Sequence, residues 1–202
     1  MMSKIFYEPN SIFSEIITQL KNGIKDRNHG FHTPTFSNLE ENGSISSRII
    51  VLRNFSQENM EIDFHSDIRS KKIDQLKINH KTNFLFYDYK TKIQLRIKTI
   101  SKIEYNNEIT NKAWINSKLM SRKCYLTKKK PSSFTNYPED GMPEHLKGIE
   151  PTKEESEKGY LNFCVINNQI YEIEWLFLSS DGHKRLLINI DKNQKNYQWL
   201  IP

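Results

Sequence analysis

The sequence predicts a mainly β domain of the α+β type, built as an antiparallel β-barrel of roughly six to eight strands with peripheral helices. Short runs of alternating apolar and polar residues follow one another through tight turns, as they do in antiparallel sheets. Helical patterns interrupt these runs at only three places. A parallel doubly wound sheet would need a crossover helix between most of its strands, so that architecture is excluded.

The first part of the chain combines one long helix with hairpin strands. Apolar residues at helical spacing predict a helix over residues 11–26 that ends near Gly23. The dipeptide Asn42-Gly43 is a strong signal for a tight turn between two strands. The second of these strands is expected over residues 45–53.

Further strands and helices follow up to residue 121. Runs of β-branched and aromatic residues predict strands over residues 60–66, 82–89 and 92–105. Residues 54–59 carry turn chemistry and are expected to form a turn. Helical spacing predicts helices over residues 69–80 and 106–121, the second capped by Asn106 or Asn107.

Residues 122–159 show no periodic pattern, and we expect them to form a long loop or lid within a single domain that spans residues 1–202. The segment contains four prolines, a run of lysines at residues 128–130 and, at most, a short polar helix over residues 152–159. It is not a linker between domains, because strand-like sequence resumes after it.

The C-terminal part of the chain returns to strands. Residues 160–190 predict two or three of them, with turns at Asn167-Asn168 and Asp181-Gly182. A short final strand is expected over the last six residues.

The composition is that of a globular protein with a polar surface. Hydrophobic residues make up 36% of the 202 residues and aromatic residues 11%, which suffices for a core. No apolar run approaches the ~18 residues that a membrane helix needs, and the segment MMSKIFYEPNSIF lacks the layout of a signal peptide. Cys124 and Cys164 form no disulfide framework and no metal-binding pair. We therefore expect a cytoplasmic protein with reduced thiols and no membrane partner.

The formal net charge of +6 indicates a partner that is an anion. Nucleic acid, acidic lipid and a phosphorylated small molecule all meet this condition. Charge alone does not choose among them, so the positions of the cations matter.

Several cations and hydroxyls are expected to meet at the start of the helix over residues 69–80. Lys71 and Lys72 open this helix, Ser66 ends the strand before it, and Arg48 lies on a neighbouring hairpin strand. Together with the free N–H groups of the helix, these side chains suit a phosphate. Asp67 is expected to cap the helix. The alternative is that the lysines form an ordinary solvated helix face.

Five short motifs resemble the pyridoxamine 5′-phosphate oxidase family, the FMN-binding split barrels. They are RIIVLR, FHSDIRSKK, KIQLRI, YEIEWL followed by GHKR, and the terminal WLIP. Each motif is short and accepts several residue types, so none is specific alone. Together they occur in the family's order and at nearly its spacings, from about Ser44 to the end of the chain. The resemblance implies a split barrel, FMN as cofactor and a homodimer with FMN at its interface.

Carried over position by position, the resemblance also implies a set of cofactor ligands. Arg48 falls on the family's phosphate-binding arginine, Gln94 on a glutamine that hydrogen-bonds the flavin edge, and Ser132 on a serine contributed across the dimer interface. The implied FMN-binding residues are Arg48, Ile49, Val51, Leu52, His65, Ser66, Lys71, Lys72, Gln94, Ser132 and Arg185.

The positions that hold the substrate in the oxidase itself are only partly kept. The residues implied at them are Arg53, Trp114, Lys118, Arg122 and His183. Lys118 and Arg122 remain cationic, whereas Asp181 stands where the oxidase has an arginine. A charge reversal beside a phosphorylated substrate weighs against oxidation of pyridoxamine 5′-phosphate.

The resemblance therefore implies an FMN-dependent oxidoreductase that passes hydride between a small substrate and the flavin. The sequence assigns no catalytic acid or base. One alternative is a split barrel that binds flavin or haem without turnover. Another is a nucleic-acid-binding barrel, because residues 83–102 alternate aromatic and cationic side chains. His29 and His32 have the spacing of metal ligands but lack a third ligand, so no metal is expected.

Overall fold

The structure, a computed structural model, describes residues 8–192 and 194–202. The N-terminal half contains α1 (Pro9–Lys25), β1 (Thr35–Leu39), β2 (Ile45–Ile49), β3 (Asn54–Ser56), β4 (Glu61–Asp67), α2 (Lys71–Ile78), β5 (Lys81–Asp88) and β6 (Ile93–Glu104). The rest contains α3 (Glu108–Ile115), α4 (Leu119–Arg122), the 3₁₀ turns η2 (Lys123–Tyr125) and η3 (Glu144–Leu146), α5 (Lys153–Glu157), η4 (Lys158–Asn162), β7 (Phe163–Phe177), β8 (Lys184–Asp191) and β9 (Gln194–Leu200). The interpretation of the N-terminal segment as lacking a signal peptide concerns residues 1–7 in large part, and these lie outside the described residues.

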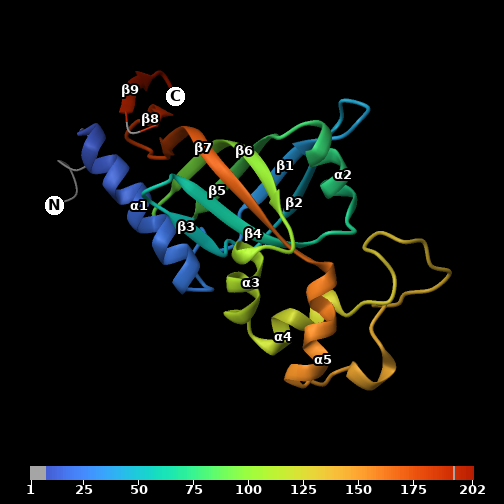
Figure 1. Cartoon of the computed structure of the whole chain (residues 1–202). Helices are drawn as coiled ribbons and strands as arrows, with labels where there is room; N and C mark the ends of the chain where they lie inside the picture. Colours follow the sequence, from blue (N-terminus) through green and yellow to red (C-terminus); the bar gives the residue numbers. More distant parts are fainter. Residues whose placement is uncertain (1–7, 193) are drawn as a thin grey trace.

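The strands form one antiparallel sheet in the described part of the chain. Its main path runs β2-β1-β5-β6-β7-β4-β3, and β8 extends it from β7 to β9. In Figure 1 the sheet curves around the centre of the molecule, with α1 along one side and α3, α4 and α5 together at one end. The predicted fold class, an antiparallel split barrel with peripheral helices, is confirmed.

The strand count of six to eight was too low, because nine strands are present in the described residues. The strand expected over residues 45–53 ends at Ile49, and the chain then runs extended to a separate short strand, β3. Residues 54–56, expected as part of a turn, pair in register with residues 61–63 of β4. Only this pairing, which sequence periodicity does not reveal, makes them a strand.

β7 is one continuous strand that pairs with three others. Its first half pairs with β4, its second half with β8, and its residues 165–177 with β6. The turn expected at Asn167-Asn168 is therefore wrong. Asn168 is fully buried, and its amide donates to the carbonyl oxygens of Ile62 (2.9 Å) and Ile166 (2.8 Å) while its oxygen accepts from Ser101 (2.6 Å). A polar side chain that usually marks turns is satisfied here inside the sheet.

A β-bulge interrupts the alternation of β7. Opposite the neighbouring residues Lys98 and Thr99 of β6 stand Glu172 and Ile170, so Tyr171 is the extra residue. Ile170 and Ile173 on either side of it are both buried. The bulge thus lets both halves of the strand direct apolar residues into the core.

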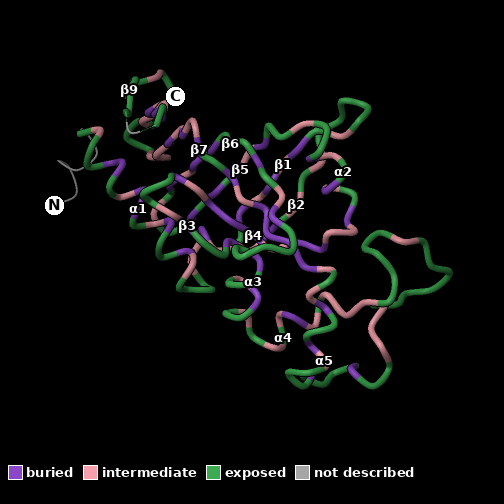
Figure 2. The backbone as a smooth tube through the Cα atoms, viewed as in Figure 1, coloured by how far each residue is buried: buried purple, intermediate pink, exposed green. Residues whose placement is uncertain are grey.

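The core lies between the curved sheet and α1, and Figure 2 shows it as the buried centre of the molecule. α1 contributes a stripe of residues at helical spacing, namely Ile12, Phe13, Ile16, Ile17 and Leu20. Pro9 suits the first turn of this helix because its missing N–H has no partner there. The stacked aromatic rings of the β strands complete the core.

The helix expected over residues 106–121 is divided. α3 is capped by Asn107 through a capping box with Thr110, as one of the two predicted caps, and it ends at Ile115. Lys118 is extended and precedes the separate turn α4. The following residues to Gly159 contain only short turns and α5, and residues 127–141 (the lid) extend outward as a mostly exposed loop (Figure 2).

No helix in the described ranges has both the length and the apolar character needed to cross a bilayer.

Candidate functional site

A cavity of about 590 Å³ (cavity 1) lies where the end of β4 and the start of α2 meet β2 and the lid. This volume is within the range of small-molecule and cofactor sites. Several residues expected to bind FMN line it, namely Arg48, Ile49, Val51, His65, Ser66, Lys72 and Ser132.

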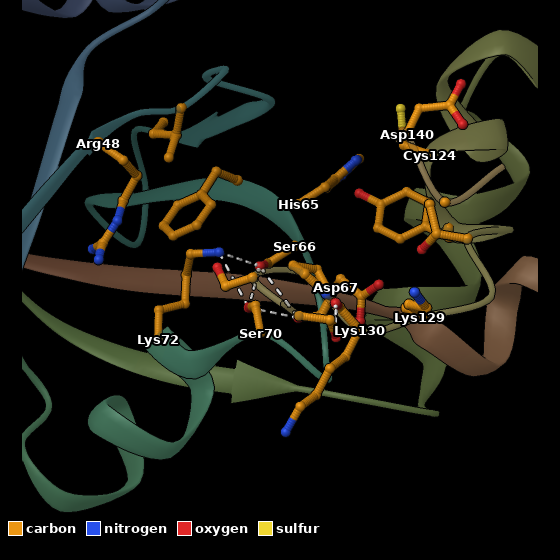
Figure 3. A pocket seen from close by; sticks show the side chains of 18 of the residues that line it. Arg48, His65, Ser66, Asp67, Ser70, Lys72, Cys124, Lys129, Lys130 and Asp140 are labelled. Carbon is orange, nitrogen blue, oxygen red and sulfur yellow. Dashed lines mark hydrogen bonds between the residues drawn. The ribbon is translucent and has the colours of Figure 1, made fainter. Parts of the chain in front are cut away.

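One end of cavity 1 carries a group of donors that we call the cationic cluster: Arg48, Ser66, Ser70 and Lys72. The Lys72 ammonium donates to the hydroxyls of Ser66 (2.9 Å) and Ser70 (3.1 Å), and the two hydroxyl oxygens are 3.3 Å apart. Figure 3 shows these three side chains converging, with the Arg48 guanidinium on the facing strand. Two serine hydroxyls and two cations around one opening suit a phosphate group.

The electrostatics of the cluster point to an anion. Burial lowers the pKa of Lys72, and the nearby charge of Arg48 lowers it further. Burial also lowers the pKa of Arg48, against a smaller opposing effect of Glu40. Neither cation has an ion pair with a carboxylate in the described part of the chain. An anion placed between them would relieve both the burial and the mutual repulsion.

Arg48 is held in place by its own strand and the next. Its two terminal nitrogens donate to the side-chain oxygens of Asn38 and Ser46, the latter at 2.6 Å, and its guanidinium lies 5.5 Å from the centre of the Phe36 ring. A guanidinium has five N–H donors, so three remain for a ligand. The arginine is therefore oriented before any ligand arrives.

The turn before α2 is fixed by an ion pair. Both carboxylate oxygens of Asp67 accept hydrogen bonds from Arg69, at 3.0 Å from Nε and 2.6 Å from Nη2. The expectation that Asp67 caps α2 is wrong, because the N-cap position is Ser70 and no side chain caps the helix there. The Asp67 side chain is three residues too early and is engaged by Arg69 instead.

His65 and Arg53 lie in the middle of the site, since both line cavity 1 and a second cavity next to it. The imidazole packs edge-on against Phe163, with ring centres 4.8 Å apart, and Figure 3 shows it pointing away from the cationic cluster. Burial lowers the pKa of His65 to about 3, and the Arg53 charge adds to the effect. His65 is therefore neutral at physiological pH.

The second cavity (cavity 2) has a volume of about 640 Å³ and lies between β3, β4 and β7 on one side and α3 with its following turn on the other. Two residues expected at the substrate, Arg53 and Lys118, line it. His65 and Arg53 thus lie at the junction of the two cavities, with the cationic cluster in cavity 1 and Lys118 in cavity 2.

Two predicted cofactor ligands that are next in sequence to cavity 1 residues, Lys71 and Leu52, do not line it. Lys71 is exposed and lines a shallow depression beside Glu40, Glu41 and Asp74. Successive helix residues differ by ~100° in direction, so Lys71 and Lys72 cannot point the same way. Leu52 is 1% exposed and belongs to the hydrophobic core, since alternation along the extended segment directs it inward between two cavity residues.

Two predicted substrate residues, Trp114 and Arg122, are held inside the protein. The Trp114 indole donates to Glu157 (3.0 Å). Arg122 is 5% exposed, donates to Glu157 (2.7 Å) and to the carbonyl oxygen of Trp114 (3.1 Å), and stacks on the Trp114 ring at 4.9 Å. These contacts fasten α3 and α4 to α5, and neither side chain lines cavity 2.

The remaining predicted residues lie on another part of the sheet. Gln94 of β6 and Arg185 of β8 both stand opposite Leu176 of β7, so all three form one row on the outer face. Arg185 is paired with Glu174 at 2.7 Å. His183 lies in the β7–β8 turn, where its Nδ1 accepts from the Ser179 N–H (3.1 Å). None of these residues lines either cavity of this chain.

Several lining residues were missed in the sequence because they come from irregular segments. The lid contributes Lys129 and Lys130 to cavity 1, and the turn before it contributes Tyr125, whose pKa burial raises. The run of three lysines was a visible signal, but its position relative to the strands was not. In cavity 2, Asp63 was visible only as one polar residue of an alternating strand.

Both histidines of the pair after α1 are engaged by residues of that helix. His29 contacts the side-chain oxygen of Gln19 (2.7 Å) and His32 the carbonyl oxygen of Gly23 (2.7 Å).

Cys124 and Cys164 are both free thiols, the first exposed and the second buried.

Comparison with known proteins agrees with this arrangement. Residues 13–104 match the family model described as pyridoxamine 5′-phosphate oxidase, FMN-binding domain. No curated protein matches the sequence.

Solved structures share the fold over nearly the whole chain. A pyridoxamine 5′-phosphate oxidase-related, FMN-binding protein from Nostoc punctiforme superposes with a TM-score of 0.73 at 17% identity, covering 94% of this chain and 97% of that one. PhzG from Burkholderia lata, in complex with tetrahydrophenazine-1-carboxylic acid, also gives 0.73 at 17% identity, covering 100% and 98%. A protein related to general stress protein 26 from Clostridium acetobutylicum gives 0.52 at 11%, covering 86% and 97%. Residues 13–104 are thus similar to the FMN-binding domain of the pyridoxamine 5′-phosphate oxidase family, and the chain shares the split-barrel fold of these solved structures.

Proposed function

We propose that the protein is a homodimeric, cytoplasmic FMN-dependent oxidoreductase, built as a single domain, that acts on a small substrate. The observation that carries the proposal is the cationic cluster, where two half-buried cations without carboxylate partners in the described residues share an opening with two serine hydroxyls. FMN would place its phosphate there, with Ile49, Val51, His65 and Ser132 along the rest of cavity 1. Bound flavin would supply the hydride chemistry, and the chain would position the reactants.

The substrate would occupy cavity 2, next to the flavin. Arg53 and Lys118 line this cavity and would bind an anionic group, while His65 lies at its junction with cavity 1. Trp114 and Arg122 are excluded from a direct role by their internal contacts. PhzG, which shares the fold, has been solved in complex with a carboxylic acid, and this supports a small anionic ligand for the present chain.

A second copy of the chain would complete the FMN site. Gln94 and Arg185 lie in one row on the outer face of the sheet, two strands apart, and are expected to be ~10 Å from each other. They cannot reach cavity 1 of their own chain, so a partner must supply them if they bind the flavin. Exposed Leu85 and Tyr87 on the same region of the sheet support burial against a partner.

The cofactor proposal is tested by comparing FMN with riboflavin. Because the cluster would make two or more charge-assisted hydrogen bonds to the phosphate, FMN should bind roughly 100-fold or more tightly than riboflavin, measured by quenching of flavin fluorescence. Equal affinities would remove the phosphate site.

The dimer proposal is tested by complementation. Lys72→Gln and Gln94→Ala variants should each bind FMN weakly, but mixed dimers formed by subunit exchange contain one intact site and should regain half of the tight binding. If dimers shown to be mixed regain no tight binding, then Lys72 and Gln94 of one chain serve the same FMN site, or Gln94 does not contact the flavin.

Binding of flavin or haem without turnover is the second candidate. One observation favours this candidate: Trp114 and Arg122 form hydrogen bonds inside the protein and do not line the cavity proposed for the substrate. Bleaching of the bound flavin's visible absorbance by a small substrate under anaerobic conditions would decide for the oxidoreductase. A flavin that exchanges no electrons with any member of a broad panel of small amines, alcohols and nicotinamides would decide for the binding role.

A further inference from the structure

The floor of cavity 2 is a row of three polar side chains on adjacent strands. Asn54 of β3 stands opposite Asp63 of β4, which stands opposite Asn167 of β7. Side chains directly opposite each other share one face of an antiparallel sheet. The two amides donate to separate oxygens of the Asp63 carboxylate, at 2.8 Å from Asn54 and 2.9 Å from Asn167. All three line the cavity.

Asp63 is a buried carboxylate without a cation beside it. It is 9% exposed, and no Lys, Arg or His forms an ion pair with it in residues 8–192 and 194–202. Burial raises its pKa, and the charges of Glu61 and Glu104 add to this against the hydrogen bonds of the two amides. Buried carboxylates are normally paired with a cation. Each Asp63 oxygen has used one lone pair on an amide and keeps another for a donor in the cavity.

Four cations also line cavity 2. Lys112 and Lys118 come from α3 and its following turn, on the side opposite the sheet, and Arg27 and Arg53 come from the segments after α1 and before β3. No ion pair joins these cations to Asp63 in the described chain. The cavity thus contains both a carboxylate without an ion pair and several cations, an arrangement complementary to a ligand that carries both charges.

We propose that Asp63, oriented by Asn54 and Asn167, is a specificity-determining residue that binds a protonated amine of the substrate. The substrate class is then a small zwitterion, with its anionic group on Arg53 and Lys118 and its ammonium on Asp63. This rests on the proposed role of cavity 2 as the substrate site. A simple anion of the same size would leave the Asp63 carboxylate buried beside it and would bind more weakly.

The test compares matched pairs of probes on the full-length protein. ω-Amino carboxylates of increasing chain length and the corresponding alkanoates are titrated by isothermal calorimetry. For the best-fitting length, the amino compound should bind roughly 10- to 100-fold more tightly, the effect of one charge-assisted hydrogen bond. Equal affinity within every pair, or no binding by any amino carboxylate, overturns the proposal.

Two variants separate recognition from general charge. Asp63→Asn should abolish the preference for the amino compound, because an amide cannot replace the carboxylate charge. Glu61→Gln removes the same charge from the same strand and the same cavity, two residues away, and should retain most of the preference. Equal losses in the two variants would mean that only the overall field matters, and a preference that survives in Asp63→Asn would mean that Asp63 only orients the two amides.

A measurement on the unaltered protein covers the case in which Asp63→Asn does not fold. In a crystal structure with the tightest-binding amino carboxylate, the ammonium nitrogen should lie within hydrogen-bond distance of an Asp63 oxygen. An ammonium elsewhere in the cavity overturns the proposal. The titrations need neither FMN nor turnover, so failure to bind FMN would count against the proposed function alone.

Discussion

Arg69 joins the turn before α2 to the base of the lid by donating twice to Thr127, at 3.1 Å to its carbonyl oxygen and 3.0 Å to its hydroxyl. The same guanidinium is held by Asp67, whose side chain is 8% exposed. The next residue, Ser70, belongs to the cationic cluster. One arginine therefore connects the lid to the expected phosphate site.

Loss of this connection should release the lid. Arg69→Gln removes the ion pair and weakens both contacts with Thr127, an expected loss of about 1–3 kcal/mol. FMN should dissociate roughly tenfold faster, and trypsin should cut sooner at the lysines of residues 128–130. Thr127→Val removes only the hydroxyl contact and should have a smaller effect on both rates. A lid that becomes no more sensitive to trypsin in Arg69→Gln would disprove the connection.

The two adjacent lysines at the start of α2 should behave differently. Lys72→Gln removes a half-buried cation from cavity 1 and should weaken FMN binding roughly ten- to a hundredfold. Lys71→Gln is the matched control, with the same change one residue away on an exposed face, and should alter affinity by less than about threefold. Flavin titration of both variants checks this. Similar losses would place both lysines at the phosphate.

Substitutions of Arg122 and Lys118 should distinguish a residue that stabilises the fold from one that binds the substrate. Arg122→Met leaves buried carbonyl oxygens and Glu157 without their donor and should lower the free energy of unfolding by about 2–4 kcal/mol. Lys118→Gln should change it by less than about 0.5 kcal/mol, because the side chain faces cavity 2 rather than the core. Urea unfolding of the two variants gives the comparison. A stable Arg122→Met protein that has lost substrate binding would restore this arginine as a ligand.

Acid should destabilise the protein through His65. Its pKa is about 3 in the folded chain and near 6.5 when unfolded, so the unfolded state gains protons first as the pH falls. The stabilising effect of the neutral imidazole is complete above pH ~6.5 and declines below it, by about 1–2 kcal/mol between pH 7 and 5. Unfolding of the FMN-free protein at both pH values should show this loss, and His65→Asn should lack it. Parallel pH profiles would mean that His65 titrates normally.

Turnover of pyridoxamine 5′-phosphate should be weak, well below about 1 per second. Asp181 stands where the oxidase has an arginine, and Trp114 and Arg122 are held by Glu157. Formation of pyridoxal 5′-phosphate and hydrogen peroxide by the FMN-loaded protein measures this rate. A rate typical of an enzyme would show that these three positions do not limit the substrate.

The sequence predicted most strands because their pattern is local. The alternation of β5, with Phe84 and Phe86 inside, is visible without any knowledge of its neighbours. β3 was missed because three residues carry no periodicity and become a strand only by pairing with β4. The Asn167-Asn168 turn was wrong because turn chemistry outweighed a buried hydrogen-bond network that involves residues far away in the sequence.

The site was predictable to the same degree. Arg48, Ser66 and Lys72 were predicted to meet because their strands were expected to be hairpin neighbours. They do line one cavity, but β2 and β4 do not pair and lie near opposite ends of the strand order, so the curvature of the sheet rather than a hairpin brings Arg48 to the other two. Lys71 could not be separated from Lys72 without the rotation of the helix. Arg122 could not be recognised as internal because its partner Glu157 lies 35 residues away in an irregular segment. The role of Asp63 could not be predicted because the two residues that orient it, Asn54 and Asn167, lie on the neighbouring strands.

The bulge at Tyr171 sets the phase of everything that follows it in β7. Before the bulge, even-numbered residues such as Ile166 face inward, and after it odd-numbered residues such as Ile173 do. Straightening the strand with Tyr171 in the regular pairing would turn Glu174 inward and Trp175 outward, as a frameshift changes a reading frame. Deletion of Tyr171 would instead keep Ile173 and Trp175 inward and remove only the local kink. The bulge thus keeps the two ends of a shared strand in step by absorbing one extra residue.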